Sequence, residues 1–342
     1  MNHFSLKKLI KFALRKTLYD LGLLGLIHRC RNRRTLTTFM FHRVLPRDSA
    51  VYRHAEKEFS FSVDGFAASL DFIQRHYHII SLRDLEEAKR SAHPLPDRAA
   101  LITFDDGWLD TIEYAYPQLK RKNISGVVFI SSEILTSPDE RWWQDALVNV
   151  LTDPLSSRLL AQELGIAPII GEQAGPKRSH AMATALVERS VAERVELLSH
   201  YAQGPGWGQQ MMQQTNLTTL DRGVLELAAH GHTHAPLTTI SDPEAELQRS
   251  YTIILDQGGR ASMSFPHGVY DAHLVALAER VGFSTIFTSD SNLSSTRVPG
   301  QLPRVFGRIH IPENEWTCDG GKISFPHLAT FLFFRPIAGK DD

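Results

Sequence analysis

The stretch AALITFDDG, residues 99–107, joins a run of apolar residues to two adjacent carboxylates and a glycine. Residues 99–104 have the length and composition of a buried strand, and Gly107 lets the chain turn sharply where that strand ends. On its own this pattern is typical of an ordinary turn after a strand, because Asp and Gly favour turns for local reasons. Its meaning therefore depends on what the neighbouring strands carry.

Similar short runs recur from residue 35 onward and alternate with helical patterns. Apolar or β-branched runs occur at 35–41, 78–81, 99–104, 126–131, 225–230, 261–265 and 284–289. Helix-like segments between them occur at 63–75, 109–121, 243–255 and 271–281. This repetition predicts an α/β protein with a largely parallel sheet or barrel, in which the loops after the strands build the site.

One long interval, between residues 131 and 225, interrupts the alternation. It contains RWWQDALVNVL, residues 141–151, and a helix-like segment at 179–203. We therefore predict a mainly helical insertion at 139–217 within a barrel domain made of residues 35–138 and 218–311. Residues 312–342 are expected to form a C-terminal tail.

Composition excludes several classes of protein. The chain has 342 residues, of which 42% are hydrophobic and 22% charged, as in an ordinary soluble globular protein. Disordered, collagen-like and coiled-coil architectures are excluded on this basis, and the length suits one large domain with an insertion or two domains. The net charge of −1 provides no overall field that would recruit nucleic acid, so no nucleic-acid partner is expected.

Cysteine usage and apolar runs bear on the cellular compartment. Cys30 and Cys318 are far apart in the sequence, which excludes a disulfide framework and any CxxC site for zinc or redox chemistry. The longest apolar run near the start, LGLLGLI at 21–27, is shorter than the ~18 residues of a membrane span. Arginines follow it with no small-x-small cleavage pattern, so we expect a cytoplasmic location.

The first 34 residues form a separate, basic segment that contains nine Lys and Arg residues and one acid, Asp20. Its apolar residues recur at helical spacing, at Leu6, Leu9, Ile10, Ala13, Thr17 and Leu21. Its opposite side carries Lys7, Lys8, Lys11 and Arg15. This is the pattern of a basic amphipathic helix. Such a helix either lies peripherally on the inner face of an anionic membrane or packs its apolar stripe on the protein body.

A second polar motif, HGHTH at residues 230–234, also closes an apolar run. If the backbone takes one helical turn there, the imidazoles of His230 and His234 face one cation; the alternative is a solvated polar loop. Strand ends of a barrel converge, so this motif and Asp105–Asp106 are expected to meet. Two histidines and one carboxylate form a facial metal set with open positions for water and substrate, and the second carboxylate can act as a base.

At this point the sequence resembles the polysaccharide deacetylases, also called the NodB-homology or carbohydrate esterase 4 family. The resemblance rests on TFDDG and the HxxxH spacing, and it implies a distorted (β/α)7-type barrel. It also implies that Asp105 is the general base and that Asp106, His230 and His234 bind one divalent metal, usually zinc. His232 inherits no role.

The stretch FPHGVYD, residues 265–271, resembles the third motif of that family in its FPYGxYD form, which makes one wall of the sugar site. The resemblance therefore implies that substrate is bound by Phe265, Pro266, His267, Gly268 and Tyr270. Trp108 is a candidate for stacking on a sugar ring beside them. Two departures stand out. Ser264 occupies the place of an arginine that tunes the base in members with the RPPY form, and His267 replaces the tyrosine.

A fourth stretch, FHRV at 41–44, resembles the YHRV segment of the subgroup that includes the poly-N-acetylglucosamine deacetylases. It implies that His42 is the general acid that protonates the leaving amine. The alternative is a packing role for His42, with His310 as a weaker candidate acid. Arg43 and Arg308 are candidates for tuning the charge of a site carboxylate.

The resulting prediction is a metal-dependent hydrolase that removes N-acetyl groups from an amino-sugar-containing cell-surface polysaccharide or its precursor. Its partner would be an N-acetylated glycan or a lipid- or nucleotide-linked sugar in bacterial exopolysaccharide biosynthesis. The alternatives are an O-acetyl esterase and a non-catalytic glycan-binding component of a polysaccharide assembly complex. The indoles of Trp108, Trp142 and Trp143 are candidates for stacking on sugar rings, although the segment RWWQDAL equally fits a helix that buries its two tryptophans.

Overall fold

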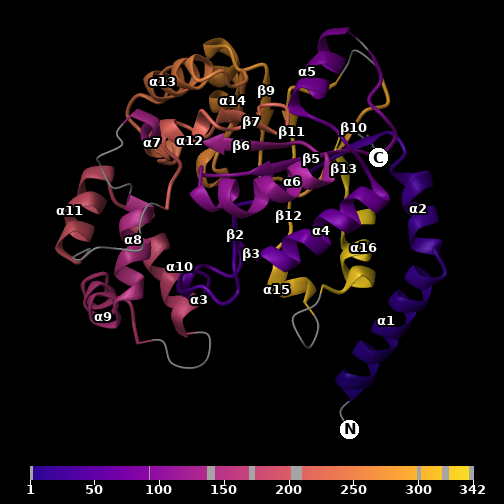
Figure 1. Cartoon of the computed structure of the whole chain (residues 1–342), viewed down its shortest axis with the longest axis horizontal. Coiled ribbons are helices and arrows are strands. Elements are labelled where there is room, and N and C mark those ends of the chain that lie inside the picture. The colour runs from indigo at the N-terminus through magenta and orange to yellow at the C-terminus, as the bar shows by residue number, and fades with distance from the viewer. Residues whose placement is uncertain are drawn as a thin grey trace.

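The computed structural model describes residues 3–91, 93–136, 143–168, 174–201, 210–298, 302–317 and 323–338. Trp142, Cys318 and the side chains of Leu6, Lys7, Lys8 and Leu9 lie outside this description. Figure 1 shows the course of the chain.

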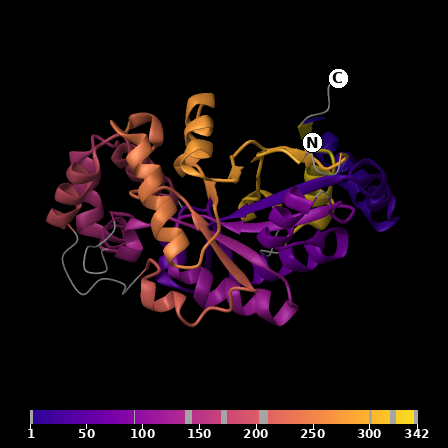
Figure 2. The ribbon, with the colours of Figure 1, turned by 90° about the horizontal axis from the view of Figure 1, so that it is seen from above.

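A parallel array of strands forms the centre of the molecule. In spatial order it contains β1 (Thr35–Phe41), β5 (Ala99–Phe104), β6 (Gly126–Ile130), β7 (Leu225–Ala229), β8 (Ser262–Ser264) and β9 (Thr285–Phe287). Each strand pairs in parallel with the next. Figure 2 shows these strands in the middle of the molecule with helices on both sides. The predicted parallel α/β arrangement is confirmed.

The segment from residue 305 to residue 310 closes the array into a barrel. Its first part, β11 (Val305–Phe306), pairs in parallel with β9, and its second part, β12 (Ile309–His310), pairs in parallel with β1. The segment thus supplies the seventh position, as expected for a distorted (β/α)7-type barrel. The predicted strand 78–81 is only β4 (His78–Ile79), a short partner of β5 outside the ring. Beside the ring, β10 (Leu293–Ser295) pairs antiparallel with β1 and parallel with β13 (Ile337–Ala338).

The barrel interior is packed, and strand alternation decides which residues face it. One apolar cluster draws alternate residues from strands around the ring, including Leu36, Leu101, Phe129, Phe287 and Phe306. Helix α5 (Leu82–Ser91) closes the N-terminal end of this cluster with Leu82 and Leu85. Glu226 of β7 accepts hydrogen bonds from the first backbone amides of α5, Leu82 N at 2.6 Å and Arg83 N at 3.2 Å. The C-terminal end is consequently the end that remains for a site.

The helices outside the ring bury one face each against the strands. They include α4 (Val63–His76), α6 (Tyr116–Lys122), α13 (Pro243–Asp256) and α14 (Ala272–Val281). Polar side chains cap three of them: Ser62 accepts from Gly65 N, Asp242 from Ala245 N, and Asp271 from Leu274 N. The predicted helix 109–121 is divided, because a π-helical turn at Thr111–Ala115 precedes α6.

The predicted insertion is helical in its described part, with α8 (Trp143–Thr152), α9 (Pro154–Glu163), α10 (Ala174–Val187) and α11 (Val191–Tyr201). These helices bury an apolar cluster of their own that includes Trp143, Leu147, Val150, Met182 and Leu198. Short helices flank it at α7 (Glu133–Thr136) and α12 (Gln214–Leu217), and α3 (Ala50–His54) packs against α8 and α10. In Figure 1 the insertion stands to the left of the barrel.

Both chain ends contribute helices on the opposite side of the molecule. Helix α1 (His3–Asp20) packs along α16 (Phe325–Phe333), and α2 (Leu23–Arg31) packs on α16 as well. The segment expected as a tail thus contains regular structure, namely α15 (Glu313–Trp316), α16 and β13. The reason is apolar burial, since Leu328 and Phe333 of α16 lie in the main core.

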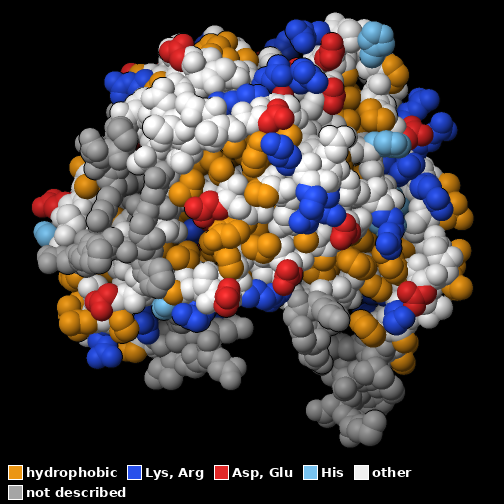
Figure 3. Space-filling model, in the orientation of Figure 1, with side chains coloured by type: hydrophobic (Ala, Val, Ile, Leu, Met, Phe, Trp, Pro, Cys, Tyr) orange, Lys and Arg blue, Asp and Glu red, His pale blue; other side chains and the backbone are white. Residues whose placement is uncertain are grey.

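In its described part, the apolar stripe predicted for the N-terminal helix is exposed. Of its members, Ile10 and Leu21 are 58% and 68% exposed and Ala13 and Thr17 are exposed too, whereas Leu18 and Tyr19, outside the stripe, pack against the core. Figure 3 shows hydrophobic side chains along the right-hand edge, over α2 and the adjoining part of α1. The four described residues of the stripe thus do not pack on the protein body. No described helix combines the length and the apolar character needed to cross a membrane.

Candidate active site

The two polar motifs meet at the C-terminal end of the barrel. Asp105 directly follows β5 and continues its ladder, because its backbone amide donates to Phe41 O at 3.0 Å. His230 directly follows β7, and its amide donates to Ile130 O at 2.9 Å. The alternation of β5 places Asp105 on the same side as Leu101 and Thr103, so its carboxylate lies over the barrel interior.

A sharp backbone turn then brings Asp106 toward the histidines. Asp106 and Gly107 adopt left-handed conformations, with φ of 75° and 90°. A side chain at residue 107 would place its Cβ atom 2.9 Å from the Ile134 side chain, so the close approach also favours glycine. The DDG sequence thus makes a turn, and the turn points its two carboxylates in different directions.

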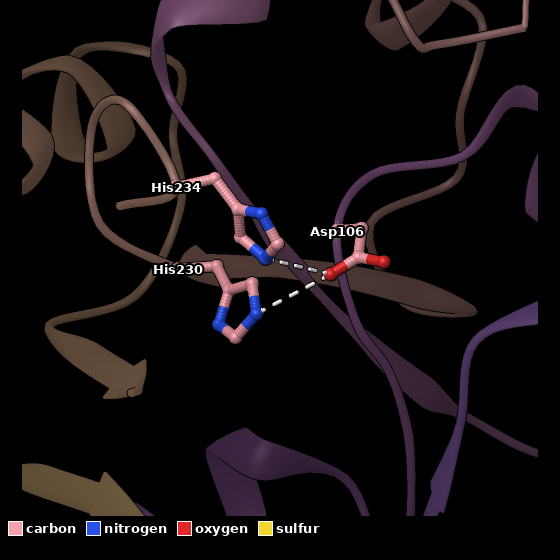
Figure 4. Close-up of side chains that lie close together, drawn as sticks. All are labelled: Asp106, His230 and His234. Carbon is pink, nitrogen blue, oxygen red and sulfur yellow. Dashed lines mark ion pairs between the residues drawn. The ribbon is translucent and has the colours of Figure 1, made fainter. Parts of the chain in front are cut away.

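Asp106, His230 and His234 form a compact cluster (Figure 4). Asp106 Oδ1 lies 3.1 Å from His234 Nε2 and 3.4 Å from His230 Nε2. The ligand atoms of all three residues lie within 4.8 Å of one another, so a single cation can be bound by all of them. Two imidazoles and one carboxylate are suitable ligands for zinc and similar divalent ions.

The outer nitrogens of both imidazoles have partners that orient the rings. His230 Nδ1 lies 3.0 Å from Ser264 O and 2.7 Å from Ser264 Oγ. Because a carbonyl can only accept, His230 is protonated on Nδ1 and its Nε2 lone pair faces Asp106. His234 Nδ1 lies 2.7 Å from the amide nitrogen of Gln144, which α8 of the insertion supplies. The residues present therefore fit a divalent metal.

Of the two alternatives for the histidine motif, a helical turn or a polar loop, the structure shows a loop. Residues 230–234 are irregular, and Gly231 and His234 have φ of 72° and 59°. Glu246 of α13 stabilises this loop by accepting from His232 N at 3.0 Å and Thr233 N at 2.6 Å. His232 turns away to Ser132 Oγ at 2.9 Å, outside the cluster.

Asp105 forms a buried bidentate ion pair with Arg308, which lies between β11 and β12. The two guanidinium nitrogens donate to Oδ1 at 2.6 Å and Oδ2 at 2.8 Å. Both residues are buried, and Arg308 Nε also donates to Thr288 O at 3.2 Å. Burial alone would raise the pKa of the Asp105 carboxyl, but the attraction of Arg308 and the neighbouring His230 lowers it below its usual value. Arg308 thus supplies a cation next to Asp105, whereas Ser264 supports His230.

His42 lies between β1 and β2 (Arg43–Leu45) and faces the same carboxylates. Its Nε2 lies 4.0 Å from Asp105 Oδ2, and within the described part of the chain its buried Nδ1 has no hydrogen-bond partner. Burial lowers the pKa of His42, while Asp106 and Asp105 oppose that shift. His310 lies behind it, with ring centroids 5.9 Å apart, and burial lowers its pKa to about 3.

Arg43 and Trp108 support the cluster from outside. Arg43 Nε donates to Asp110 at 2.8 Å, and its guanidinium lies 3.9 Å from the centroid of the Trp108 ring. Trp108 Nε1 in turn donates to Asp106 Oδ2 at 2.8 Å, and its side chain is largely buried. The structure therefore places Arg43 beside Asp110 rather than Asp105, and it places Trp108 as a hydrogen-bond donor to Asp106 rather than as an open stacking surface.

The FPHGVYD stretch contributes fewer contacts than its resemblance implies. Phe265 is buried and stacks on Tyr270 at 5.2 Å, and the Tyr270 hydroxyl donates to Asp290. Pro266 packs against the Gly231 turn. His267, at φ 56°, donates from Nε2 to His234 O at 3.0 Å. From this stretch only His267 and Gly268 border the cavity described next.

A cavity of about 610 Å³ opens over these residues. This volume lies within the range of about 300–1,000 Å³ that small-molecule sites occupy. The cavity is bordered on one side by the candidate catalytic residues His42, Asp105, Asp106, His230, His234 and Arg308. The sequence did not indicate that Ser264 and Gln144 orient the histidines or that Glu246 stabilises their loop. No local spacing relates these three residues to the ones they support.

Comparison with protein-family models and with curated protein sequences gives no match. Solved structures do resemble this chain. A Streptococcus pyogenes deacetylase, PplD, solved with acetate, gives a TM-score of 0.54 at 13% identity over 82% of this chain and 94% of its own. IcaB from Ammonifex degensii gives 0.54 at 16% identity over 88% and 97%. A de-N-acetylase from Aggregatibacter actinomycetemcomitans gives 0.53 at 14% identity over 87% and 100%. The chain thus has the fold of NodB-type deacetylase structures.

Proposed function

We propose that this protein is a metal-dependent hydrolase that removes N-acetyl groups from an amino sugar in a cell-surface polysaccharide or its precursor. One observation carries the proposal: the ion-paired carboxylate of Asp105 lies directly beside the Asp106–His230–His234 cluster at the open end of the barrel. A base next to a three-ligand metal set is an arrangement for hydrolysis, and a glycan-binding module has no need of it.

In this proposal Asp106, His230 and His234 hold one divalent ion, with zinc as the expected metal. When bound, such an ion supplies Lewis-acid chemistry at the amide carbonyl. Asp105 takes the proton from the attacking water, and Arg308 keeps the Asp105 carboxylate ionised and fixed in orientation. His267 and Gly268 border the place where the acetamido group would lie.

His42 completes the proposed mechanism as the general acid. Collapse of the tetrahedral intermediate needs a proton at the leaving nitrogen, and His42 Nε2 faces Asp105 across 4.0 Å from the cavity wall. The proton that Asp105 takes from water can pass across this gap to neutral His42 and from His42 to the leaving nitrogen, so the step needs no other proton source. Acetate and a free amine on the sugar are the products.

Two measurements on the purified chain test this function. Elemental analysis should find about one divalent ion per chain in the wild type and a loss of that ion in Asp106→Ala and His230→Ala, while circular dichroism remains unchanged. Acetate release from N-acetylated amino sugars should fall by about 10²- to 10⁴-fold in Asp105→Ala, as expected for loss of a general base. A folded wild type that binds no metal after reloading would refute the mechanism, and faster acetate release from O-acetylated sugars would indicate an esterase.

We also propose peripheral contact of the N-terminal helices with the cytoplasmic face of a membrane. The exposed apolar residues of α1, α2 and the turn between them include Ile10, Leu14, Leu21, Leu23 and Leu26. Lys11, Arg29 and Arg34 are exposed on the same two helices and the turn after them. An apolar face beside cations matches an anionic lipid surface.

Vesicle sedimentation tests this contact. The full chain should bind phosphatidylglycerol-containing vesicles better than phosphatidylcholine vesicles, and the double variant Leu14→Ser/Leu21→Ser should bind several-fold less. Val298→Ser, which removes an exposed apolar side chain elsewhere, is the matched control. Equal binding of the double variant and the control would refute the proposed contact.

A further inference from the structure

The cavity that holds the candidate catalytic residues continues to an apolar wall built by the insertion and α3. The apolar side chains of this wall are Val51, Ala55, Leu147, Val148, Leu151, Ala183 and Val187. They come from α8, α10 and α3 together with Ala55, the residue that follows α3. We refer to these seven residues as the apolar wall.

Polar side chains near the apolar wall are engaged with the protein itself. Ser179 Oγ donates to His54 O at 2.7 Å, and Thr184 Oγ1 donates to His180 O at 2.9 Å. His180 Nδ1 lies 3.1 Å from Glu56 Oε2. Sugar hydroxyls need partners when they are buried, and the hydroxyl protons of Ser179 and Thr184 and the facing atoms of His180 and Glu56 are already engaged within the protein. The wall therefore suits an apolar part of a ligand.

Aromatic side chains that border the cavity are also unsuited to a chain of sugar rings. Among the described residues, Trp108 and Trp143 are only 7% and 3% exposed. Each has a guanidinium on its ring, from Arg43 at 3.9 Å and Arg194 at 5.0 Å. Phe59 is stacked on His310 at 5.2 Å. The two indoles therefore offer no open face for stacking on successive sugars, and Phe59 is already stacked on His310.

We infer that the substrate is an N-acetylated sugar joined to an aliphatic chain, with the chain lying against the apolar wall. The inference rests on the proposed function, because deacetylation requires room for only a methyl group on the acyl side of the amide. The chain must therefore belong to the sugar part of the substrate, as in a glycolipid. Such a substrate also agrees with the shape of the site, which is polar at the metal cluster and apolar beyond it.

Alkyl glycosides provide the test. The zinc-loaded full chain is assayed for acetate release from methyl and octyl 2-acetamido-2-deoxy-β-glucopyranoside, both below micellar concentrations. Each buried methylene group contributes about a fourfold gain in affinity. We expect the octyl glycoside to have at least about a tenfold higher kcat/KM, through a lower KM. Calorimetric binding of the same two compounds gives a readout that does not depend on turnover.

Variants of the apolar wall connect this preference to the structure. Val148→Thr/Val187→Thr keeps side-chain shape but adds two hydroxyls to the wall, and it should reduce the octyl preference by about three- to tenfold. The loss of kcat/KM should be larger for the octyl glycoside than for the methyl glycoside. Val195→Thr is the matched control, because Val195 lies on α11 of the same insertion and is 47% exposed.

Different results refute different claims. If the methyl glycoside is hydrolysed as well as the octyl one, the chain-binding inference is wrong and the deacetylase function stands. Faster hydrolysis of a methyl glycoside that carries an N-octanoyl group would place the chain on the acyl side and also overturn the inference. If no acetate is released but the octyl compound binds more tightly than the methyl one, the deacetylase function fails while the apolar wall is confirmed as a chain-binding surface.

Discussion

Arg308 determines how Asp105 can act as a base, although the two residues lie 203 positions apart in the sequence. A carboxylate without a partner at this depth would be protonated, because burial disfavours its charged form. The fork of two short hydrogen bonds offsets that cost and fixes both oxygens. The DDG motif after β5 supplies Asp105, and the segment between β11 and β12 supplies the Arg308 cation. An ionised base at this position therefore requires both segments.

The buried ion pair predicts that removing Arg308 alone destabilises the protein, and that removing the Asp105 charge as well restores much of the lost stability. Arg308→Met leaves a buried, unpaired carboxylate and should lower the free energy of unfolding by about 3–5 kcal/mol. The double variant Asp105→Asn/Arg308→Met removes the charge as well and should recover a large part of the loss. Urea denaturation of the chain in EDTA measures both. A double variant no more stable than Arg308→Met would show that the ion pair is not the cause.

Gln144 predicts a different effect, on metal affinity. When His234 Nε2 binds a cation, its Nδ1 carries the proton and must donate. A half-turn of the Gln144 amide brings Oε1 to that position, and Oε1 has no partner among the described residues. Gln144→Ala should therefore weaken zinc affinity about 10- to 100-fold, whereas Gln144→Glu should retain it.

Competition with a chromogenic chelator measures zinc affinity in these variants. Gln118→Ala is the matched control, since Gln118 is buried on α6 and donates to two backbone carbonyls away from the cluster. Equal affinities of Gln144→Ala and Gln118→Ala would exclude a positioning role for Gln144. Loss of affinity in Gln144→Glu as well as in Gln144→Ala would show that the amide group itself is required, because Glu keeps both the volume and an acceptor oxygen.

At the scale of elements, the N-terminal helices are held to the barrel by a buried histidine. His28 of α2 stacks on Phe333 of α16 at 4.1 Å, and its Nε2 lies 3.2 Å from His76 O at the end of α4. Its Nδ1 accepts from the Asn32 amide at 2.9 Å. All of these contacts suit a neutral ring, and burial lowers the pKa of His28 to about 3 and that of His76 to about 4.

The sign of the pH effect follows from these shifts. Below pH 6.5 the unfolded chain binds a proton at His28 that the folded chain does not bind, so stability falls as the pH falls. The loss should be about 1.4 kcal/mol per pH unit for this residue between pH 6.5 and 3. His28→Gln should remove that part of the slope in urea titrations. Phe333→Leu should destabilise the chain but keep the slope, and a slope equal to wild type in His28→Gln would contradict this account.

For the whole molecule, the sequence predicted those features that depend on local pattern. Runs at 35–41 and 99–104 match β1 and β5 because fully buried parallel strands are continuously apolar. The closing strands β11 and β12 have only two residues each, too few for a periodic pattern, and were not predicted. Gln144, Ser264 and Glu246 reach the site only through tertiary packing, so no spacing in the sequence indicates them.

Closure of the barrel also sets the place of Arg308, and Gly307 makes this closure testable. A Cβ atom at residue 307 would lie 2.3 Å from Asn292 Oδ1 and 2.5 Å from the Asp290 carbonyl oxygen. The backbone between β11 and β12 would have to shift, and with it the guanidinium that pairs with Asp105. Gly307→Ala should therefore cost about 1–3 kcal/mol of stability and lower acetate release, with zinc stoichiometry unchanged.

Gly25→Ala is the matched control for Gly307→Ala, because it makes the same substitution in a helix. Gly25 lies inside α2, and the nearest atom to its added Cβ would be His76 Cε1 at 3.9 Å, an ordinary contact distance. It should raise stability by about 0.5–1 kcal/mol and leave acetate release unchanged. If Gly307→Ala loses stability but keeps full activity, closure supports the fold alone. A parallel loss of both would instead mean that the segment which completes the barrel also positions the catalytic ion pair.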